Sequence, residues 1–229
     1  MEPMKKQRHP FQDSGRISIR GFSLVELLVV LAIMAILVGA TVPALQSLLQ
    51  NLNVAQGGQA LVEQINLARQ IASSQNHTVE IRLIKLAQVQ TATAVGYNAI
   101  QLWSWPDPTT PASTAVPLSR MVILPQATVI SQETSTYSQF LNGASTSLTM
   151  PVPGGGTAKY AAFHISPSGL VELMKSTGPT LDLSMTTTVL VVVPARYGNT
   201  TNVASQGGPA NFVLVQLDPD TATTLVFRP

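Results

Sequence analysis

Residues 21–45 read GFSLVELLVVLAIMAILVGATVPAL, and this stretch decides the fold because it is one long apolar run. Between Phe22 and Val42 the only ionisable side chain is that of Glu26. At about 1.5 Å per residue, a helix of this length spans roughly 30 Å, which is the thickness of the hydrocarbon core of a bilayer. We therefore predict a single membrane-spanning helix over residues 22–43.

The charges on either side of this run give its orientation. The basic residues before it are Lys5, Lys6, Arg8, Arg16 and Arg20, whereas the first basic residue after it is Arg69. Because basic residues stay on the cytoplasmic side, we predict that residues 1–21 form a basic cytoplasmic leader. The C-terminal part of a single-pass inner-membrane protein of this orientation lies in the periplasm.

Composition restricts the possible partners and chemistry. Charged residues make up 10% of the chain and the mean hydropathy is +0.25, which is low in charge for a soluble globular protein. The part beyond the leader is nearly neutral and has no basic stripe, so nucleic acid is not expected as a partner. Cysteine is absent, which excludes disulfides, thiolate metal sites and a cysteine nucleophile.

A secretory signal peptide is the first alternative for such an N-terminus. Its cleavage site would follow the apolar run and show small residues in an A-x-A arrangement, but the residues after Val42 read PALQSLLQNL. The small residue in a suitable setting is Gly21, before the run. Glu26 is unusual, because a carboxylate at the centre of a membrane helix costs about 2.5 to 3.5 kcal/mol. Glu26 lies only four residues beyond Phe22, so its side chain could also reach the lipid headgroups at the membrane surface.

The basic leader, Gly21, Phe22, Glu26 and Pro43 together resemble the prepilin-type N-terminus of type IV pilins and of type II secretion pseudopilins. The resemblance implies that a prepilin peptidase/methyltransferase cleaves after Gly21 and methylates the new N-terminal Phe22. It also implies assembly into a filament with other pilin-like subunits, after storage in the lipid bilayer and with the help of inner-membrane assembly machinery. No cofactor and no enzymatic activity are expected.

A physical role for Glu26 follows from this cut. Cleavage after Gly21 creates an ammonium group on Phe22, and Glu26 of a neighbouring subunit can pair with it. Two unit charges about 4 Å apart attract by roughly 4 kcal/mol at an effective dielectric of 20. This is comparable with the insertion cost of the carboxylate, so we expect the pair to set axial register more than to add affinity.

The next segment, residues 44–75, is predicted to be an amphipathic helix. Its apolar positions recur at spacings of three and four and are Leu45, Leu48, Leu52, Ala55, Val62, Ile65, Ala68 and Ala72. Pro43 is expected to kink the rod because it lacks an N–H group and clashes with the preceding turn. Gly57 and Gly58 form a second expected weak point.

Residues 76–229 are predicted to form a mostly antiparallel β domain, because the apolar period changes to two. The expected strands begin at Thr78, Tyr97, Met121, Ala127, Lys159, Leu170, Thr187, Asn211 and Thr223. Loops rich in Pro, Gly, Ser and Thr are expected from Ser104, Thr149 and Ala195. The predicted fold class is therefore α+β, with a long N-terminal helix packed on this domain.

The β domain also carries a resemblance. FHISPSGLVEL, from Phe163 to Leu173, and the C-terminal DPDTATTLVFRP look like the end of GspH-like minor pseudopilins. The chain also resembles the group of prepilin-like proteins called Verru_Chthon cassette protein D. The chain departs from the pseudopilin pattern at the last turn, where Thr221-Ala222-Thr223 replaces T-G-R and leaves the geometry of the final hairpin open.

Few residues suggest chemistry. His9, His77 and His164 are isolated in sequence, and the chain lacks the H-E-x-x-H, G-x-S-x-G and S-x-x-K motifs. Asp218 and Asp220 are weak candidates for binding calcium, although Asp-Pro-Asp-Thr is equally typical of a type I turn. We therefore predict a filament subunit, and the alternative is a periplasmic enzyme or ligand-binding domain on an uncleaved signal anchor.

Overall fold

The computed structural model describes residues 23–86, 96–105, 115–132, 138–141, 148–153, 155–175, 178–180, 188–198, 209 and 211–229. The chain divides into two compact units, Met1–Leu45 and Gln46–Pro229. The boundary between these units falls close to Pro43. Gly21, Phe22, His9 and Gly154 lie outside the described residues.

A single helix, α1, runs from Leu24 to Gln75 and belongs to both units. It continues through Pro43 and through Gly57 and Gly58, so the helix does not end at any of these residues. The predicted segments 22–43 and 44–75 are therefore parts of one helix.

The buried stripe of α1 begins later than the sequence pattern predicts. Its fully buried apolar side chains are Val54, Leu61, Ile65, Ala68 and Ala72. The prediction that Leu45, Leu48 and Leu52 belong to this stripe is wrong, because all three are exposed. The hydrophobic core of the second unit includes no α1 residue before Val54, so the earlier leucines have no core to pack against.

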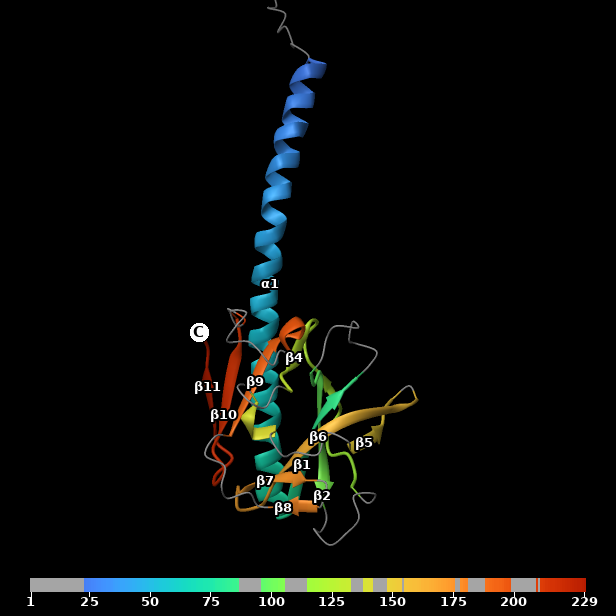
Figure 1. Cartoon of the computed structure of the whole chain (residues 1–229), viewed down its shortest axis with the longest axis vertical. Coiled ribbons are helices and arrows are strands. Elements are labelled where there is room, and N and C mark those ends of the chain that lie inside the picture. The colour runs from blue at the N-terminus through green and yellow to red at the C-terminus, as the bar shows by residue number, and fades with distance from the viewer. Residues whose placement is uncertain are drawn as a thin grey trace, which may run out of the picture. The chain divides into compact units, whose positions relative to one another are not determined.

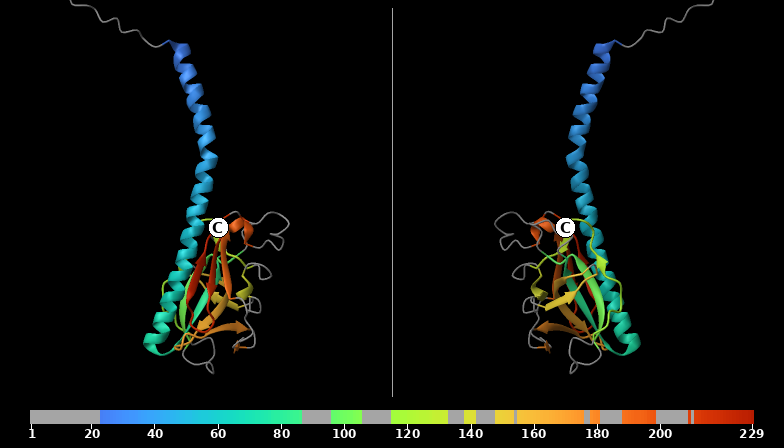
Figure 2. Two further views of the ribbon diagram at one scale, coloured as in Figure 1. Left: turned by 90° about the vertical axis from the view of Figure 1, so that its left-hand side faces the viewer. Right: turned by 90° about the vertical axis from the view of Figure 1, so that its right-hand side faces the viewer.

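Two antiparallel sheets pack on residues 46–75 of α1 (Figures 1 and 2). Sheet A has the order β3-β2-β1-β6-β7-β8, with β5 paired to β6, and sheet B has the order β11-β10-β9-β4. Sheet A contains β1 (Thr78–Lys85), β2 (Ala99–Trp105), β3 (Val122–Ile123), β5 (Leu148–Pro151), β6 (Thr157–Ile165), β7 (Val171–Lys175) and β8 (Gly178–Thr180). Sheet B contains β4 (Thr128–Ile130), β9 (Val189–Pro194), β10 (Val213–Leu217) and β11 (Thr224–Phe227). Short 3-10 turns cover Gln139–Leu141 (η3) and Ala195–Tyr197 (η4).

The inner faces of the two sheets share one core with α1. In sheet A, Ile81 of β1 lies opposite Leu102 of β2 and Phe163 of β6, and all three are fully buried. The sheets are joined at Tyr97 and Ile130, whose backbones exchange hydrogen bonds of 2.9 and 2.8 Å. The α+β fold predicted from the sequence is confirmed.

Gly57 and Gly58 allow α1 to approach sheet B closely. A Cβ atom added at Gly57 would lie 2.8 Å from Thr128 Cγ2, and one added at Gly58 would lie 2.5 Å from Val213 Cγ1. Real Cβ atoms do not approach other atoms so closely. Gly57 and Gly58 therefore form a surface on which sheet B packs. The sequence predicts only that they weaken the helix and does not predict this packing role.

Each of the nine predicted strands is present, but two further strands were missed. The loop predicted from Thr149 is wrong at its start, because Leu148–Pro151 forms β5 and pairs with β6. Gly155 and Gly156 follow with φ near +90°, which lets the chain turn back. β8 was also missed. Most of the loops predicted from Ser104 and Ala195 lies outside the described residues.

The last hairpin keeps a turn that favours glycine although it contains none. Ala222 has a φ of 50°, in the left-handed region where glycine is preferred, and its side chain is fully buried. Its N–H donates to the carbonyl oxygen of Asp218 at 2.9 Å. The replacement of T-G-R by Thr221-Ala222-Thr223 therefore leaves a tight hairpin between β10 and β11.

The outer face of sheet A contains a buried charged cluster of Glu80, Arg82 and His164. Arg82 Nε donates to Glu80 Oε1 at 2.6 Å, and the Arg82 guanidinium lies 4.0 Å from the centre of the Trp103 ring. Glu80 Oε2 is 3.4 Å from His164 Nε2, within ion-pair distance but without hydrogen-bond geometry. Burial acts to raise the pKa of Glu80, but contact with His164 and the charge and hydrogen bond of Arg82 outweigh it and hold that pKa below its ordinary value of 4.5.

We predict that Gly58→Ala destabilises the fold by up to about 2 kcal/mol, because the added methyl group would overpack against Val213 at a cost of about 1 to 3 kcal/mol. This cost is offset in part by the gain in helix propensity of about 1 kcal/mol. Urea unfolding of the detergent-solubilised chain, followed by tryptophan fluorescence, measures the difference. Gly39→Ala is the matched control, since nothing lies within 4 Å of a Cβ atom there. Equal or greater stability of Gly58→Ala would contradict the close approach.

We predict that Glu80→Gln lowers the free energy of unfolding by about 3 to 5 kcal/mol, because Arg82 is left as a buried charge without its counterion. A lowered folded pKa means that ionised Glu80 stabilises the fold above pH 4.5 and that this contribution is lost as the pH falls below that value. Melting temperatures between pH 7 and pH 3 should therefore fall less steeply in the variant than in the wild type. The control is Glu172→Gln. Glu172 is half-buried on β7 and lies opposite His164 of β6, and its replacement should change the free energy of unfolding little.

Candidate processing and assembly site

The first turn of α1 is closed by a reciprocal pair of hydrogen bonds between Ser23 and Glu26. The N–H of Glu26 donates to Ser23 Oγ at 3.2 Å, and the N–H of Ser23 donates to Glu26 Oε2 at 3.4 Å. This is a capping box, in which a serine and a glutamate three residues later satisfy two amides that a helix start otherwise leaves free. Sequence reasoning missed this local role of Glu26, although the spacing S-L-V-E indicates it.

The capping box places the Glu26 carboxylate at the start of the helix. The aligned peptide dipoles leave partial positive charge there, so a carboxylate is favourable and an added cation is unfavourable. Phe22, which lies outside the described residues, directly precedes Ser23. An ammonium group created on Phe22 would therefore sit at the unfavourable end of the dipole, and Glu26 is the acidic residue of the first turn that can offset it.

The first unit exposes a continuous apolar surface. The large apolar side chains from Leu24 to Val38 are between 43% and 80% exposed. Contiguous apolar surface of this kind marks a site that another apolar surface covers. Between Glu26 and Glu63 the chain has no ionisable side chain at all.

The membrane span predicted over residues 22–43 is not confirmed. Among the helical residues that the structure describes, none form a helix with both the length and the apolar character needed to cross a membrane.

The candidate calcium ligands lie in a turn that uses one of them internally. Asp218 Oδ1 accepts a hydrogen bond of 2.9 Å from the N–H of Asp220, and bonds from Asp220 and Thr221 lower the pKa of Asp218. This geometry supports the turn interpretation of Asp-Pro-Asp-Thr. No group of three His, Cys, Asp or Glu side chains that could hold a metal occurs within the described ranges.

The two histidines in the described ranges have local structural contacts. His77 follows the end of α1, with Nε2 at 2.8 Å from Gln75 Oε1 and Nδ1 at 3.0 Å from the carbonyl oxygen of Thr78. His164 belongs to the buried cluster with Glu80 and Arg82. The sequence pattern missed that cluster, whose signal is the pair Glu80 and Arg82 at alternate positions of an otherwise apolar strand.

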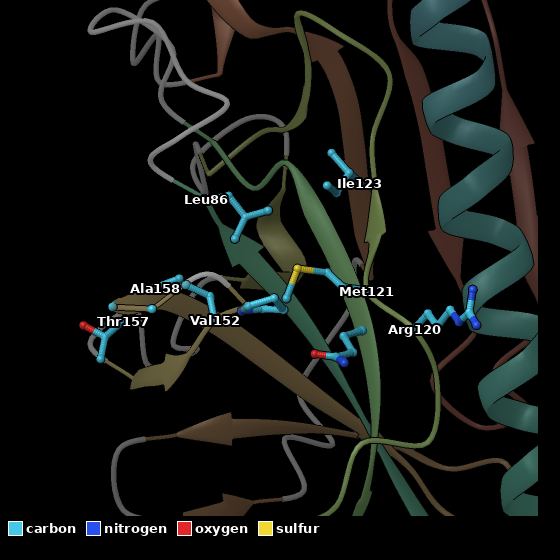
Figure 3. A pocket seen from close by; sticks show the side chains of 11 residues that line it. Leu86, Arg120, Met121, Ile123, Val152, Thr157 and Ala158 are labelled. Carbon is cyan, nitrogen blue, oxygen red and sulfur yellow. The ribbon is translucent and has the colours of Figure 1, made fainter.

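A hollow of about 590 Å³ lies on the outer face of sheet A beside the β5–β6 hairpin. Leu86, Met121 and Val152 lie close together around it, whereas Arg120 extends away from them (Figure 3). Its volume and apolar lining are typical of small-molecule sites. This hollow is the feature that bears on the alternative of a ligand-binding domain.

Comparison with known families finds a match at the N-terminus. The family described as the prokaryotic N-terminal methylation motif matches residues 16–42, a range that includes Gly21, Phe22 and Glu26. No curated protein and no solved structure matches the chain. The resemblance of the β domain to GspH-like pseudopilins and to Verru_Chthon cassette protein D therefore has no support beyond the sequence pattern.

The matched motif connects the geometry to a function. It implies a membrane-anchored N-terminus that a prepilin peptidase processes and that assembles with other pilin-like subunits. It supports a structural subunit over an enzyme. At its N-terminus the chain carries a prepilin-type methylation motif on a capped, apolar helix.

Proposed function

We propose that this chain is a subunit of a pilus or pseudopilus-type filament. The observation that carries the proposal is the methylation motif at residues 16–42 on a helix whose apolar side chains are exposed. Such a surface is unfavourable in water, by about 25 cal/mol for each Å² of apolar area. A lipid bilayer covers it before assembly, and the helices of neighbouring subunits cover it in the filament.

Processing converts the anchored precursor into an assembly-competent subunit. A prepilin peptidase/methyltransferase cuts after Gly21, on the cytoplasmic side of the inner membrane, and methylates Phe22. The β domain lies in the periplasm and faces outward in the filament. The finer assignment is that of a minor pseudopilin of the GspH-like type in a secretion system, which the patterns from Phe163 to Leu173 and near the C-terminus favour.

Glu26 has two roles in this proposal. Within one subunit it caps α1 through Ser23, which holds the carboxylate close to the start of the helix. Between subunits it accepts the Phe22 ammonium group of a neighbour, and this contact sets the axial register. The capping box reduces the conformational freedom that Glu26 would otherwise lose on pairing.

The alternative function is a periplasmic ligand-binding domain on an uncleaved anchor, favoured by the apolar hollow near Met121. The two functions differ in the fate of residues 1–21. In the alternative these residues stay attached.

We predict that the mature membrane-bound chain begins with N-methylated Phe22 when it is expressed with a prepilin peptidase. Mass spectrometry of the purified protein measures both the loss of residues 1–21 and the added methyl group. Gly21→Leu should retain the leader, whereas Gly15→Leu, a change at another leader glycine, should be cut normally. An intact leader in the functional wild-type protein would overturn the proposal and favour the uncleaved anchor.

We predict that Glu26→Gln lowers incorporation into filaments about tenfold or more, the equivalent of about 1.4 kcal/mol, because the charge that pairs with Phe22 is lost. Glutamine can still form a capping box, so this variant separates the charge from the cap. Incorporation is measured as the fraction of subunit in sheared filaments, with leader cleavage as the control for membrane delivery. Normal assembly of Glu26→Gln but not of Glu26→Ala would assign the role to the cap alone.

A further inference from the structure

β11 is an outer strand of sheet B with an unusually apolar surface. Among the strands that the structure describes, β11 pairs with β10 alone and forms the edge of sheet B (Figure 1). Leu225, Val226 and Phe227 are 61%, 42% and 52% exposed. Outer strands usually carry charges, prolines or bulges that prevent pairing with other chains. Thr224–Phe227 carries none of these, and Arg228 and Pro229 come only after the strand.

The hydrogen-bond pattern shows which backbone groups of β11 are free. The N–H of Leu217 donates to the carbonyl oxygen of Thr188 at 2.7 Å, on the β9 side of β10. Because backbone groups alternate in direction along an antiparallel strand, Val215 also bonds toward β9. Thr224 and Val226, which lie opposite Leu217 and Val215, therefore direct their N–H and C=O groups away from β10.

The side chain of Val226 contributes to a hollow beside this free edge. The hollow is about 590 Å³ in volume and is lined by Val226 and Arg228 and by Gln59, Val62 and Glu63 of α1. Val62 and Val226 give it apolar walls, and Glu63 and Arg228 place opposite charges at the same site. On the other face of β11, Leu225 and Phe227 expose a second pair of apolar side chains.

We propose that β11 is a docking strand that binds an extended segment of a partner protein by β-strand addition. The backbone of the segment pairs with the free N–H and C=O groups of Thr224 and Val226, and one apolar side chain enters the hollow beside Val62. The next side chain along the segment contacts Leu225 or Phe227, so the partner segment is apolar on both faces. This inference goes beyond the proposed filament role and does not depend on it.

An extended segment fits these observations better than a helix or a lipid surface. A helix satisfies its backbone groups internally and lipid tails offer none, so neither would pair with the free N–H and C=O groups at Thr224 and Val226. These groups are two residues apart, which is the spacing at which a neighbouring strand presents its own groups.

The proposal is tested with the full chain in detergent and a synthetic peptide of residues 221–229, TATTLVFRP, as a model extended segment. Fluorescence anisotropy of the labelled peptide measures its affinity for the wild type, Val226→Pro and Val226→Ala. Proline removes the outward N–H without breaking a bond to β10, whereas alanine keeps that N–H and shortens the side chain to a similar degree. We expect Val226→Pro to weaken binding about tenfold or more and Val226→Ala by only a few fold.

Hydrogen exchange then locates the bound peptide, with slower exchange expected at the Val226 amide of the wild type. Thr224→Pro, whose N–H also faces outward, serves if Val226→Pro does not keep the wild-type melting temperature. Equal affinity of wild type and proline variant would overturn the proposal. The same holds if a peptide with proline in place of its valine binds equally well, or if protection appears on α1 or near Met121. The N-terminal state of Phe22 is measured separately, so these results do not bear on the filament role.

Discussion

The structure depends on the burial of one stripe of α1 against two sheets at once. Val54, Leu61, Ile65, Ala68 and Ala72 pack into a core to which both sheets contribute. Gly57 and Gly58 bring the helix backbone close enough for Thr128 and Val213 to contact it. The sheets also contact each other directly, through the backbone hydrogen bonds between Tyr97 and Ile130 and between the N–H of Val171 and the carbonyl oxygen of Pro219.

The same helix also carries the apolar surface that the sheets leave exposed. Val54, Leu61, Ile65, Ala68 and Ala72 are covered by the chain itself, whereas the large apolar side chains from Leu24 to Val38 are not. The methylation motif lies on this uncovered part. One part of α1 is therefore covered by the sheets of the same chain. In the proposed function, the other part is covered by lipid or by neighbouring subunits, and this division connects the fold to that function.

The sequence predicted the fold class and the strands because their signals are local. Alternating apolar residues in β1 and β10 and the short β-branched run of β9 specify strands, and the long run after Gly21 specifies a helix. The start of the buried stripe was missed because Leu45, Leu48 and Leu52 have the same spacing as the buried residues, and only tertiary packing separates them. β5 was missed because Pro151 and the following glycines suggested a loop. Glu80 and Arg82 at alternate positions of β1 are visible in the sequence, but their contact with His164 depends on the pairing of β1 with β6, which no local pattern reveals.

At the candidate site, the sequence identified Gly21, Phe22 and Glu26 through the joint pattern that the family match also covers. Their roles stay predictions, because Gly21 and Phe22 lie outside the described residues. The capping box between Ser23 and Glu26 is local, and its sequence signal is the spacing S-L-V-E.

The close contact at Gly58 has a mechanical consequence. The side chain of Val213 occupies the space that a Cβ atom at Gly58 would need, so it sits in a notch on the helix surface. Moving α1 along its axis by one turn, about 5.4 Å, would bring Leu61 or Val54 to that position in place of glycine. Close-packed interiors have no room for such an exchange. A pulling force on the helix would therefore be transmitted to sheet B through this notch instead of being lost in slippage.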